Sequence, residues 1–236
     1  MINNNLHKFI MQKVLIAIAD DNFLVSNIYF KGGTCAVMLG YLDRFSVDLD
    51  FDIKKGADRD IVDEHINKIF DNLDLKIDIK QKEKLFYTVK YKAEKNFRST
   101  LKLSVSDDVC DSNIYKPYKF NLIDRTLICQ DLPTMFANKL VTPIDRFKRK
   151  KIVAARDIFD IHEFFISDYP INYAVIKERT GLEFKEYVKK LIVFINKHVT
   201  EKTIDQDLNY LLDYDKFKKI RKMLKQDTLL LLKNLI

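Results

Sequence analysis

The chain has 236 residues, and its 47% hydrophobic content is enough for a packed core and excludes a largely disordered protein. A formal net charge of +7 favours a polyanionic partner such as a nucleic acid. Three widely spaced cysteines and four histidines form no disulfide or zinc-ligand pattern, so a reduced cytoplasm is the expected compartment.

The first element expected is a helix from about Leu6 to Asp21, because apolar residues recur there at helical spacing. Its apolar run, residues 9–19, is interrupted by Gln12 and Lys13 and is too short to cross a bilayer. We therefore expect a buried amphipathic helix and no membrane partner.

The most informative stretch, residues 30–53, reads FKGGTCAVMLGYLDRFSVDLDFDI. Gly32 and Gly33 predict a tight turn that lets backbone N–H groups approach a ligand closely. Thr34 is a good N-cap for a short helix that follows. Because such a helix points its positive end at the glycine turn, the arrangement suits a phosphate.

Strict alternation predicts a strand directly after this helix. One face would carry the apolar side chains of Val47, Leu49, Phe51 and Ile53, and the other Ser46, Asp48, Asp50 and Asp52. Carboxylate oxygens are ligands that Mg²⁺ uses, and two carboxylates one pleat apart can hold metal ions. We therefore predict a metal site at Asp48 and Asp50. The structural alternative is the solvated face of an amphipathic edge strand.

Strands and helices alternate through the rest of the first half, which indicates an α+β catalytic domain. A helix capped by Asp58 is expected to reach Asn72, and strands are expected at residues 75–79, 85–91 and 99–105 and near Leu127. From Pro133 the pattern is helical, with helices also expected near residues 173–180, 183–199, 204–212 and 216–236. We place the boundary near Asp131, which gives a catalytic domain, residues 1–131, and a helical domain, residues 132–236.

Two places in the helical half carry chemistry-bearing side chains. Lys139 lies beside an apolar stripe, where it either covers apolar surface with its stem or neutralises a phosphate. Arg156 and Asp160 are one helical turn apart and could form an intrahelical ion pair. Between them, the basic residues 146–151 are expected to form a solvated loop that could also follow an RNA backbone.

Three motifs now carry a family resemblance. The run Lys31-Gly32-Gly33-Thr34, followed by Arg44-Phe45-Ser46-Val47-Asp48-Leu49-Asp50, resembles the first motif of DNA polymerase β-type nucleotidyltransferases, and most of all the AbiEii/AbiGii toxin family. Residues 136–140 (FANKL) resemble the second motif of that family, and Arg156-Asp157-x-x-Asp160 resembles the third. The resemblance spans about residues 30–165.

This resemblance implies an α+β fold, with a nucleotidyltransferase-type mixed sheet and helices followed by an all-helical C-terminal domain. It also implies Mg²⁺, a nucleoside triphosphate, an RNA acceptor with tRNA as the expected one, and a separately encoded antitoxin. The residues it assigns to metal binding and catalysis are Asp48, Asp50, Lys139 and Asp157. Those it assigns to nucleotide binding are Lys31, Gly32, Gly33, Thr34, Arg44, Ser46, Arg156 and Asp160.

One departure from the superfamily pattern leaves alternatives open. A third carboxylate usually comes from a later strand, but Ser104 stands at that place in residues 99–105. Asp107, Asp108 or Asp52 could supply the acid instead. The alternatives to an active RNA-modifying enzyme are a catalytically degenerate nucleotide- or RNA-binding protein and a small-molecule nucleotidyltransferase.

Overall fold

The computed structural model describes residues 4–94 and 97–236, and the chain forms two compact units. The first, which we call the sheet unit, consists of Met1–Gly40, Ser46–Val109 and Tyr115–Gln130. The second, the helical unit, joins Asp131–Ile236 to two earlier segments, Tyr41–Phe45 and Cys110–Ile114.

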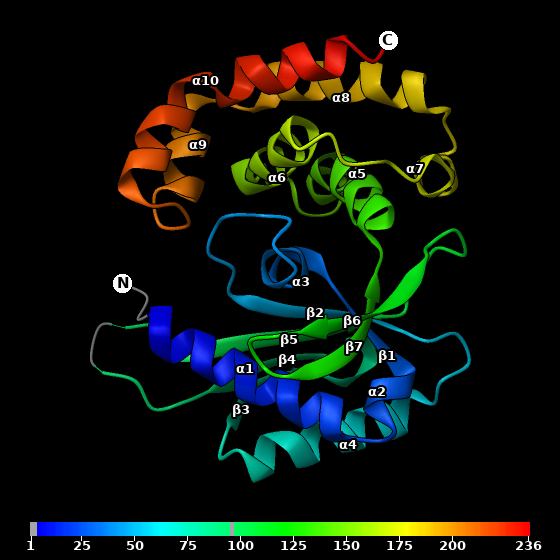
Figure 1. Cartoon of the computed structure of the whole chain (residues 1–236), viewed down its shortest axis with the longest axis vertical. Coiled ribbons are helices and arrows are strands. Elements are labelled where there is room, and N and C mark those ends of the chain that lie inside the picture. The colour runs from blue at the N-terminus through cyan, green and yellow to red at the C-terminus, as the bar shows by residue number, and fades with distance from the viewer. Residues whose placement is uncertain (1–3, 95–96) are drawn as a thin grey trace. The chain divides into compact units, whose positions relative to one another are not determined.

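The sheet unit is built on a mixed sheet that has seven strands within the described residues, in the order β3-β4-β5-β2-β1-β7-β6 (Figure 1). The strands are β1 (Ile28–Lys31), β2 (Asp48–Ile53), β3 (Lys76–Gln81), β4 (Phe86–Lys90), β5 (Thr100–Ser106), β6 (Tyr115–Phe120) and β7 (Arg125–Gln130). The pairs β1–β7 and β2–β5 are parallel, and the other neighbours are antiparallel. The α+β class expected from the sequence is therefore confirmed.

The helices of this unit are α1 (Asn4–Asp20), α2 (Leu24–Asn27), α3 (Gly32–Met38) and α4 (Arg59–Asn72), with a 3₁₀ turn η1 (Lys82–Lys84). Helices α1, α2 and α4 cover one face of the sheet (Figure 1), and α3 packs against β1 and β2. Asp58 caps α4 as predicted, because its carboxylate accepts hydrogen bonds from the N–H groups of Asp60 and Ile61.

The alternation expected around β2 is present. Val47, Leu49, Phe51 and Ile53 are all buried, and Phe51 packs on Phe30 of β1 with ring centroids 5.2 Å apart. This apolar face fixes the strand, because a slip by one residue would turn every carboxylate of β2 into the core.

Strand β6 was not predicted. It reads YKPYKF, in which Pro117 and two lysines hide the strand pattern. Proline is tolerated there because β6 is an edge strand, whose one partner in the described part of the chain is β7.

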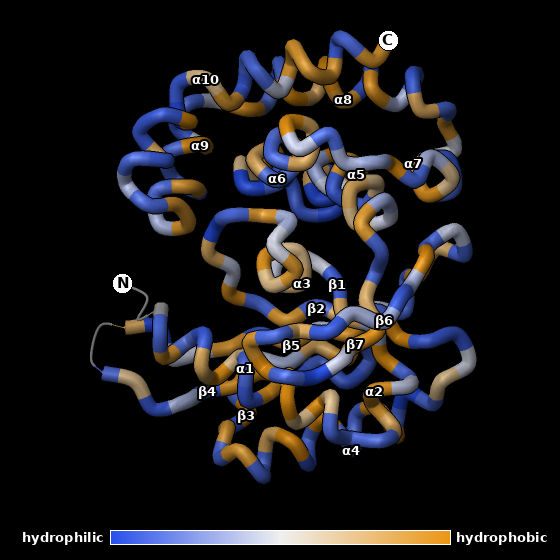
Figure 2. Tube along the Cα trace, viewed as in Figure 1, coloured by the Kyte–Doolittle hydropathy of each residue, from blue (hydrophilic) through white to orange (hydrophobic). Residues whose placement is uncertain are grey.

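The helical unit contains α5 (Leu132–Lys150), α6 (Ala155–Ile166), α7 (Tyr173–Thr180), α8 (Phe184–His198), α9 (Glu201–Leu208) and α10 (Tyr214–Lys233). Helix α6 contacts α5, α9 and α10, and it is buried on most sides, as expected of a central helix. Hydrophilic and apolar residues alternate along α8 and α10 (Figure 2), as in amphipathic helices that cover a core.

The solvated loop expected at residues 146–151 is wrong. Helix α5 continues through Pro143 to Lys150, and Lys151 ends it in a left-handed conformation with φ 56°. Basic residues are favourable in this last turn because the helix dipole presents its negative end there.

Candidate active site: a carboxylate strand and a cation cluster

Asp48 and Asp50 lie on the same face of β2 and are half-buried. In the parallel pairing with β5, Asp50 stands opposite Ser104, whose hydroxyl donates to Asp50 Oδ1 at 2.7 Å. In the antiparallel pairing with β1, Asp50 stands opposite Lys31. The two carboxylates therefore lie near the middle of the sheet, on the strand between β5 and β1.

Gly32 begins α3 directly beside Asp50. It has a φ of +80°, and a Cβ added there would lie 2.8 Å from Asp50 Oδ2. Both facts require glycine, since a side chain would be strained and would collide with the carboxylate. The sequence predicts a close backbone approach to a ligand at the glycine pair, and in the structure the group beside Gly32 is the Asp50 carboxylate.

Thr34 does not cap α3, which corrects the predicted N-cap. The N-cap position belongs to Lys31, and Thr34 is a buried residue within the helix. Its hydroxyl lies 2.8 Å from Ser46 Oγ and 2.5 Å from the carbonyl oxygen of Asp48. Thr34 and Ser46 thus fix the start of β2 and the position of Asp48.

Asp52 differs from its two neighbours because it is 1% exposed and fully partnered. The Lys31 ammonium pairs with Oδ1, while the Tyr115 hydroxyl and the Gln130 amide each donate to Oδ2 at 2.7 Å. Three donors on one buried carboxylate leave it little capacity for a metal ion. Lys31, expected at the nucleotide, here neutralises Asp52.

The other candidates for a third acid are also placed. Asp107 pairs with Arg59 and Asp108 is exposed beyond the end of β5. The position facing Asp50 on β5 is Ser104, as the sequence pattern indicated.

A metal ion fits this donor set. Within residues 4–94 and 97–236, no three His, Cys, Asp or Glu side chains converge on a metal-sized site. Mg²⁺, however, is commonly held by one or two carboxylates, with water and substrate phosphates completing its coordination. Asp48 and Asp50 supply two carboxylates on one strand face, next to a backbone cradle that excludes a Cβ.

The helical unit brings together three residues that come from three separate motifs. Arg44 is bidentate on Asp160, with Nε 2.5 Å from Oδ1 and a terminal nitrogen 2.8 Å from Oδ2. Lys139 Nζ lies 2.6 Å from Oδ2. Residues 44, 139 and 160 thus form one cluster, which we call the cation cluster.

The electrostatics of this cluster favour an anion. Burial alone would raise the pKa of Asp160, but the charges of Arg44 and Lys139 lower it to about 2. Asp160 is therefore ionised, and two cations face one carboxylate. The surplus positive charge can offset a phosphate, since Lys139 remains 14% exposed.

The intrahelical ion pair that Arg156 and Asp160 could form, the structural alternative to a role at the nucleotide, is absent among the described residues. Asp160 is occupied by the cation cluster, and Asp157 is held by Arg146, with Nε 2.7 Å from Oδ2. Arg156 is half-buried and makes no hydrogen bond or ion pair with any residue that the structure describes. The sequence did not indicate Arg146 as the partner of Asp157, because residues 146–151 were expected to form a solvated loop.

Another residue that sequence reasoning missed is Arg98, whose terminal nitrogen lies 3.2 Å from Asp48 Oδ1. It comes just before β5, and neither its spacing nor its neighbours in the sequence indicated a role. Only the pairing of β5 with β2 brings it to the carboxylate strand.

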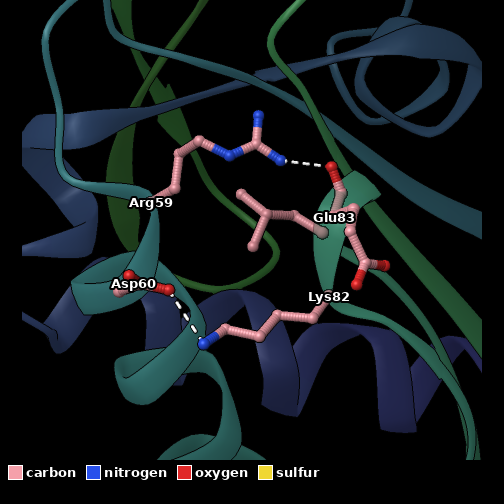
Figure 3. A pocket seen from close by; sticks show the side chains of 5 residues that line it. Arg59, Asp60, Lys82 and Glu83 are labelled. Atoms are coloured by element: carbon pink, nitrogen blue, oxygen red, sulfur yellow. Dashed lines mark hydrogen bonds and ion pairs between the residues drawn. The ribbon is translucent and has the colours of Figure 1, made fainter.

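A surface pocket of about 190 Å³ lies elsewhere in the sheet unit (Figure 3). Its walls are Arg59 and Asp60 of α4, the η1 residues Lys82 and Glu83, and Leu85. Lys82 pairs with Asp60 at 2.9 Å and Arg59 donates to the Glu83 carbonyl, so the polar walls largely satisfy one another. None of the predicted site residues lines this pocket.

Solved structures of other proteins share the fold of this chain. The chain superposes on JHP933 from Helicobacter pylori with a TM-score of 0.56 and 22% identity, over 98% of this chain and 93% of that one. It superposes on MenT4, a nucleotidyltransferase toxin from Mycobacterium tuberculosis H37Rv, with a TM-score of 0.58 and 14% identity, over 97% and 83%. At these identities the likeness establishes the fold alone, which is that of a nucleotidyltransferase. A search of curated proteins found no match.

The sequence family is established separately. Residues 13–232 match the family described as nucleotidyl transferase AbiEii toxin, type IV TA system. Because this match covers most of the chain, the protein belongs to the AbiEii family of nucleotidyltransferase toxins, as its motifs predicted. Among the described residues no helix is both long and apolar enough to cross a bilayer.

Proposed function

We propose that this protein transfers a nucleotide from a nucleoside triphosphate to an RNA acceptor, with tRNA as the expected acceptor, in a Mg²⁺-dependent reaction. The observation that carries the proposal is the pair of half-buried carboxylates, Asp48 and Asp50, beside the Gly32 cradle in a chain of this family. We also propose a separate protein, an antitoxin, as a partner, because the family consists of toxins from toxin–antitoxin systems.

In this proposal Asp48 and Asp50 hold Mg²⁺, which would activate the acceptor hydroxyl and neutralise the leaving pyrophosphate. Ser104 and Gly32 fix the Asp50 carboxylate from two sides, so it is oriented before substrate arrives. Gly33 and the backbone at the start of α3 remain our candidates for phosphate contact.

The cation cluster supplies the positive charge for the triphosphate. Lys139 and Arg44 contact phosphate oxygens, and Asp160 holds both cations in place. Asp157 is 2% exposed and bound to Arg146, so it fits a positioning role better than proton transfer. Arg156, whose donors are free among the described residues, is available to the nucleotide.

An RNA acceptor is supported by the charge of the helical unit. Its segments contain 22 basic and 17 acidic residues, whereas the sheet unit has 19 and 17. Four consecutive exposed cations, Lys148 to Lys151, close α5. Such a run can neutralise RNA phosphates and would make binding weaken steeply as salt rises.

The test is transfer of labelled nucleotide from each of the four triphosphates to total tRNA in the presence of Mg²⁺. We expect label on RNA from at least one triphosphate, and none with Asp48→Asn. Asp78→Asn is a matched control, because Asp78 lies on the exposed edge strand β3 and its ion-pair partner within the described residues is Lys90. Labelling of a small molecule in place of RNA, or no labelling despite bound nucleotide, would overturn the proposal.

A further inference from the structure

Arg98 is held in a defined position next to β2. Its Nε donates to the carbonyl oxygen of Thr100 at 2.8 Å, and a terminal nitrogen lies 3.2 Å from Asp48 Oδ1. The Arg98 side chain is 22% exposed and that of Asp48 is 30% exposed. The guanidinium therefore lies at the edge of the carboxylate strand and remains open to a ligand.

The backbone of Arg98 is fixed through a second route. The Tyr91 hydroxyl lies 3.0 Å from the Arg98 carbonyl oxygen and 2.7 Å from Nδ1 of His7. His7 Nε2 lies 2.8 Å from the carbonyl oxygen of Val47, the residue before Asp48. Through Tyr91 and His7, the main-chain carbonyl of Arg98 is thus linked to the main-chain carbonyl of Val47, in addition to the side-chain contact between Arg98 and Asp48.

Most of the hydrogen-bonding capacity of Arg98 is unused. A guanidinium has five N–H donors. Within the described residues, one donates to Thr100 and one points at Asp48, which leaves three without a partner. Arg44 and Arg125, in contrast, are each bidentate on a carboxylate.

Lys31 cannot take this place. The Lys31 ammonium neutralises the buried Asp52 carboxylate. Lys102 stands opposite Asp48 in the β2–β5 pairing and is exposed. Arg98, in contrast, contacts Asp48 directly and, among the described residues of the sheet unit, still keeps donors available. A permanently charged, planar donor group of this kind matches the oxygen atoms of a phosphate.

We propose that Arg98 is a triphosphate-binding residue: it orients Asp48 through one carboxylate oxygen and donates its remaining N–H groups to a nucleotide phosphate. This inference rests on the proposed function, because it presumes that a metal-bound nucleotide occupies the carboxylate strand. It adds a cation that no motif assigns to the site.

The test uses ligands that need no knowledge of the base. Calorimetry measures the affinity for inorganic tripolyphosphate with Mg²⁺, and electron paramagnetic resonance measures the affinity for Mn²⁺ alone. We expect Arg98→Ala to weaken tripolyphosphate binding by roughly 10-fold or more, the loss of a charge-assisted hydrogen bond. The tripolyphosphate affinity of Arg98→Lys should fall between those of the wild type and Arg98→Ala, because lysine keeps the charge and loses the planar donors.

Binding of Mn²⁺ alone should not weaken in Arg98→Ala, since removing a nearby cation reduces repulsion. Arg125→Ala is the control, because Arg125 pairs with exposed Asp20 in the same unit. Equal losses of Mn²⁺ and tripolyphosphate affinity would assign Arg98 a structural role and overturn the inference, as would unchanged tripolyphosphate binding.

The two proposals fail in different ways. If the wild-type protein binds Mn²⁺ through Asp48, as judged by Asp48→Ala, but Arg98→Ala retains tripolyphosphate affinity, only the role of Arg98 is refuted. If the folded wild-type protein binds neither Mn²⁺ nor tripolyphosphate, the proposed function fails as well.

Discussion

The two candidate regions use aspartate in opposite ways. In the sheet unit, Asp48 and Asp50 each accept from one side chain among the described residues, Arg98 and Ser104 respectively, and remain half-exposed. In the helical unit, Asp160 is fully buried and neutralised by two cations. A carboxylate with free oxygens can bind a metal ion, whereas one saturated by cations positions those cations.

The comparison predicts that the first kind of aspartate matters for chemistry and the second for stability. Asp52 shows that the distinction does not follow from sequence spacing, because it lies on the same strand as Asp48 and is buried and saturated like Asp160. Substitutions of each kind should separate the two roles.

Replacing either carboxylate of the proposed metal site should abolish transfer. We expect Asp48→Asn and Asp50→Asn to reduce the transfer rate by about 10³-fold, the scale of losing a principal charge-stabilising group in an active site. The melting temperature should change little, because both side chains are half-exposed. A large loss of stability with retained transfer would assign these residues to the fold instead.

Replacing the buried Asp160 should instead lower the stability of the protein. Asp160→Asn leaves Arg44 and Lys139 without their counter-charge, and we expect a loss of about 3–5 kcal/mol in the free energy of unfolding. Urea denaturation measures it. Glu183→Gln serves as control, since the exposed Glu183–Lys177 pair should contribute at most about 1 kcal/mol.

The Gly32 cradle can be tested with a matched glycine. Gly32 and Gly40 have nearly equal φ angles, +80° and +79°, but a Cβ would meet Asp50 only at Gly32. Both alanine variants should lose about 1–3 kcal/mol from backbone strain. Only Gly32→Ala should also reduce metal affinity and transfer. Similar transfer rates for the two variants would mean that the close approach to Asp50 has no functional consequence.

The stability that Asp160 contributes through the cation cluster should depend on pH. The pKa of Asp160 is lowered from 3.8 to about 2 in the folded protein, where burial is outweighed by Arg44 and Lys139. Its contribution to stability is therefore fully present above pH 3.8 and is lost as the pH falls towards 2. The difference in unfolding free energy between wild type and Asp160→Asn should narrow over that range. A difference independent of pH would mean that Asp160 is not charged in the folded state.

Local features of the chain were readable from its sequence. The alternation of Val47 to Ile53 determined strand β2, because a half-buried strand needs a side-chain period of two. Asp58 and the pair Leu132-Pro133 marked helix starts, since capping depends on neighbouring residues only. The order of the glycine, aspartate and lysine motifs was sufficient to identify the family.

The partner of each charged side chain was decided by the tertiary structure. Arg156 and Asp160 are one turn apart on α6, yet Asp160 pairs with Arg44, which lies 116 positions earlier. The segment Tyr41–Phe45 joins the helical unit, although its neighbours on both sides belong to the sheet unit. Arg98 reaches Asp48 only because β5 pairs in parallel with β2. Sequence periodicity specifies which face of a helix or strand a residue occupies. The tertiary path of the chain specifies which residue lies opposite that face, and the partners in ion pairs depend on this path.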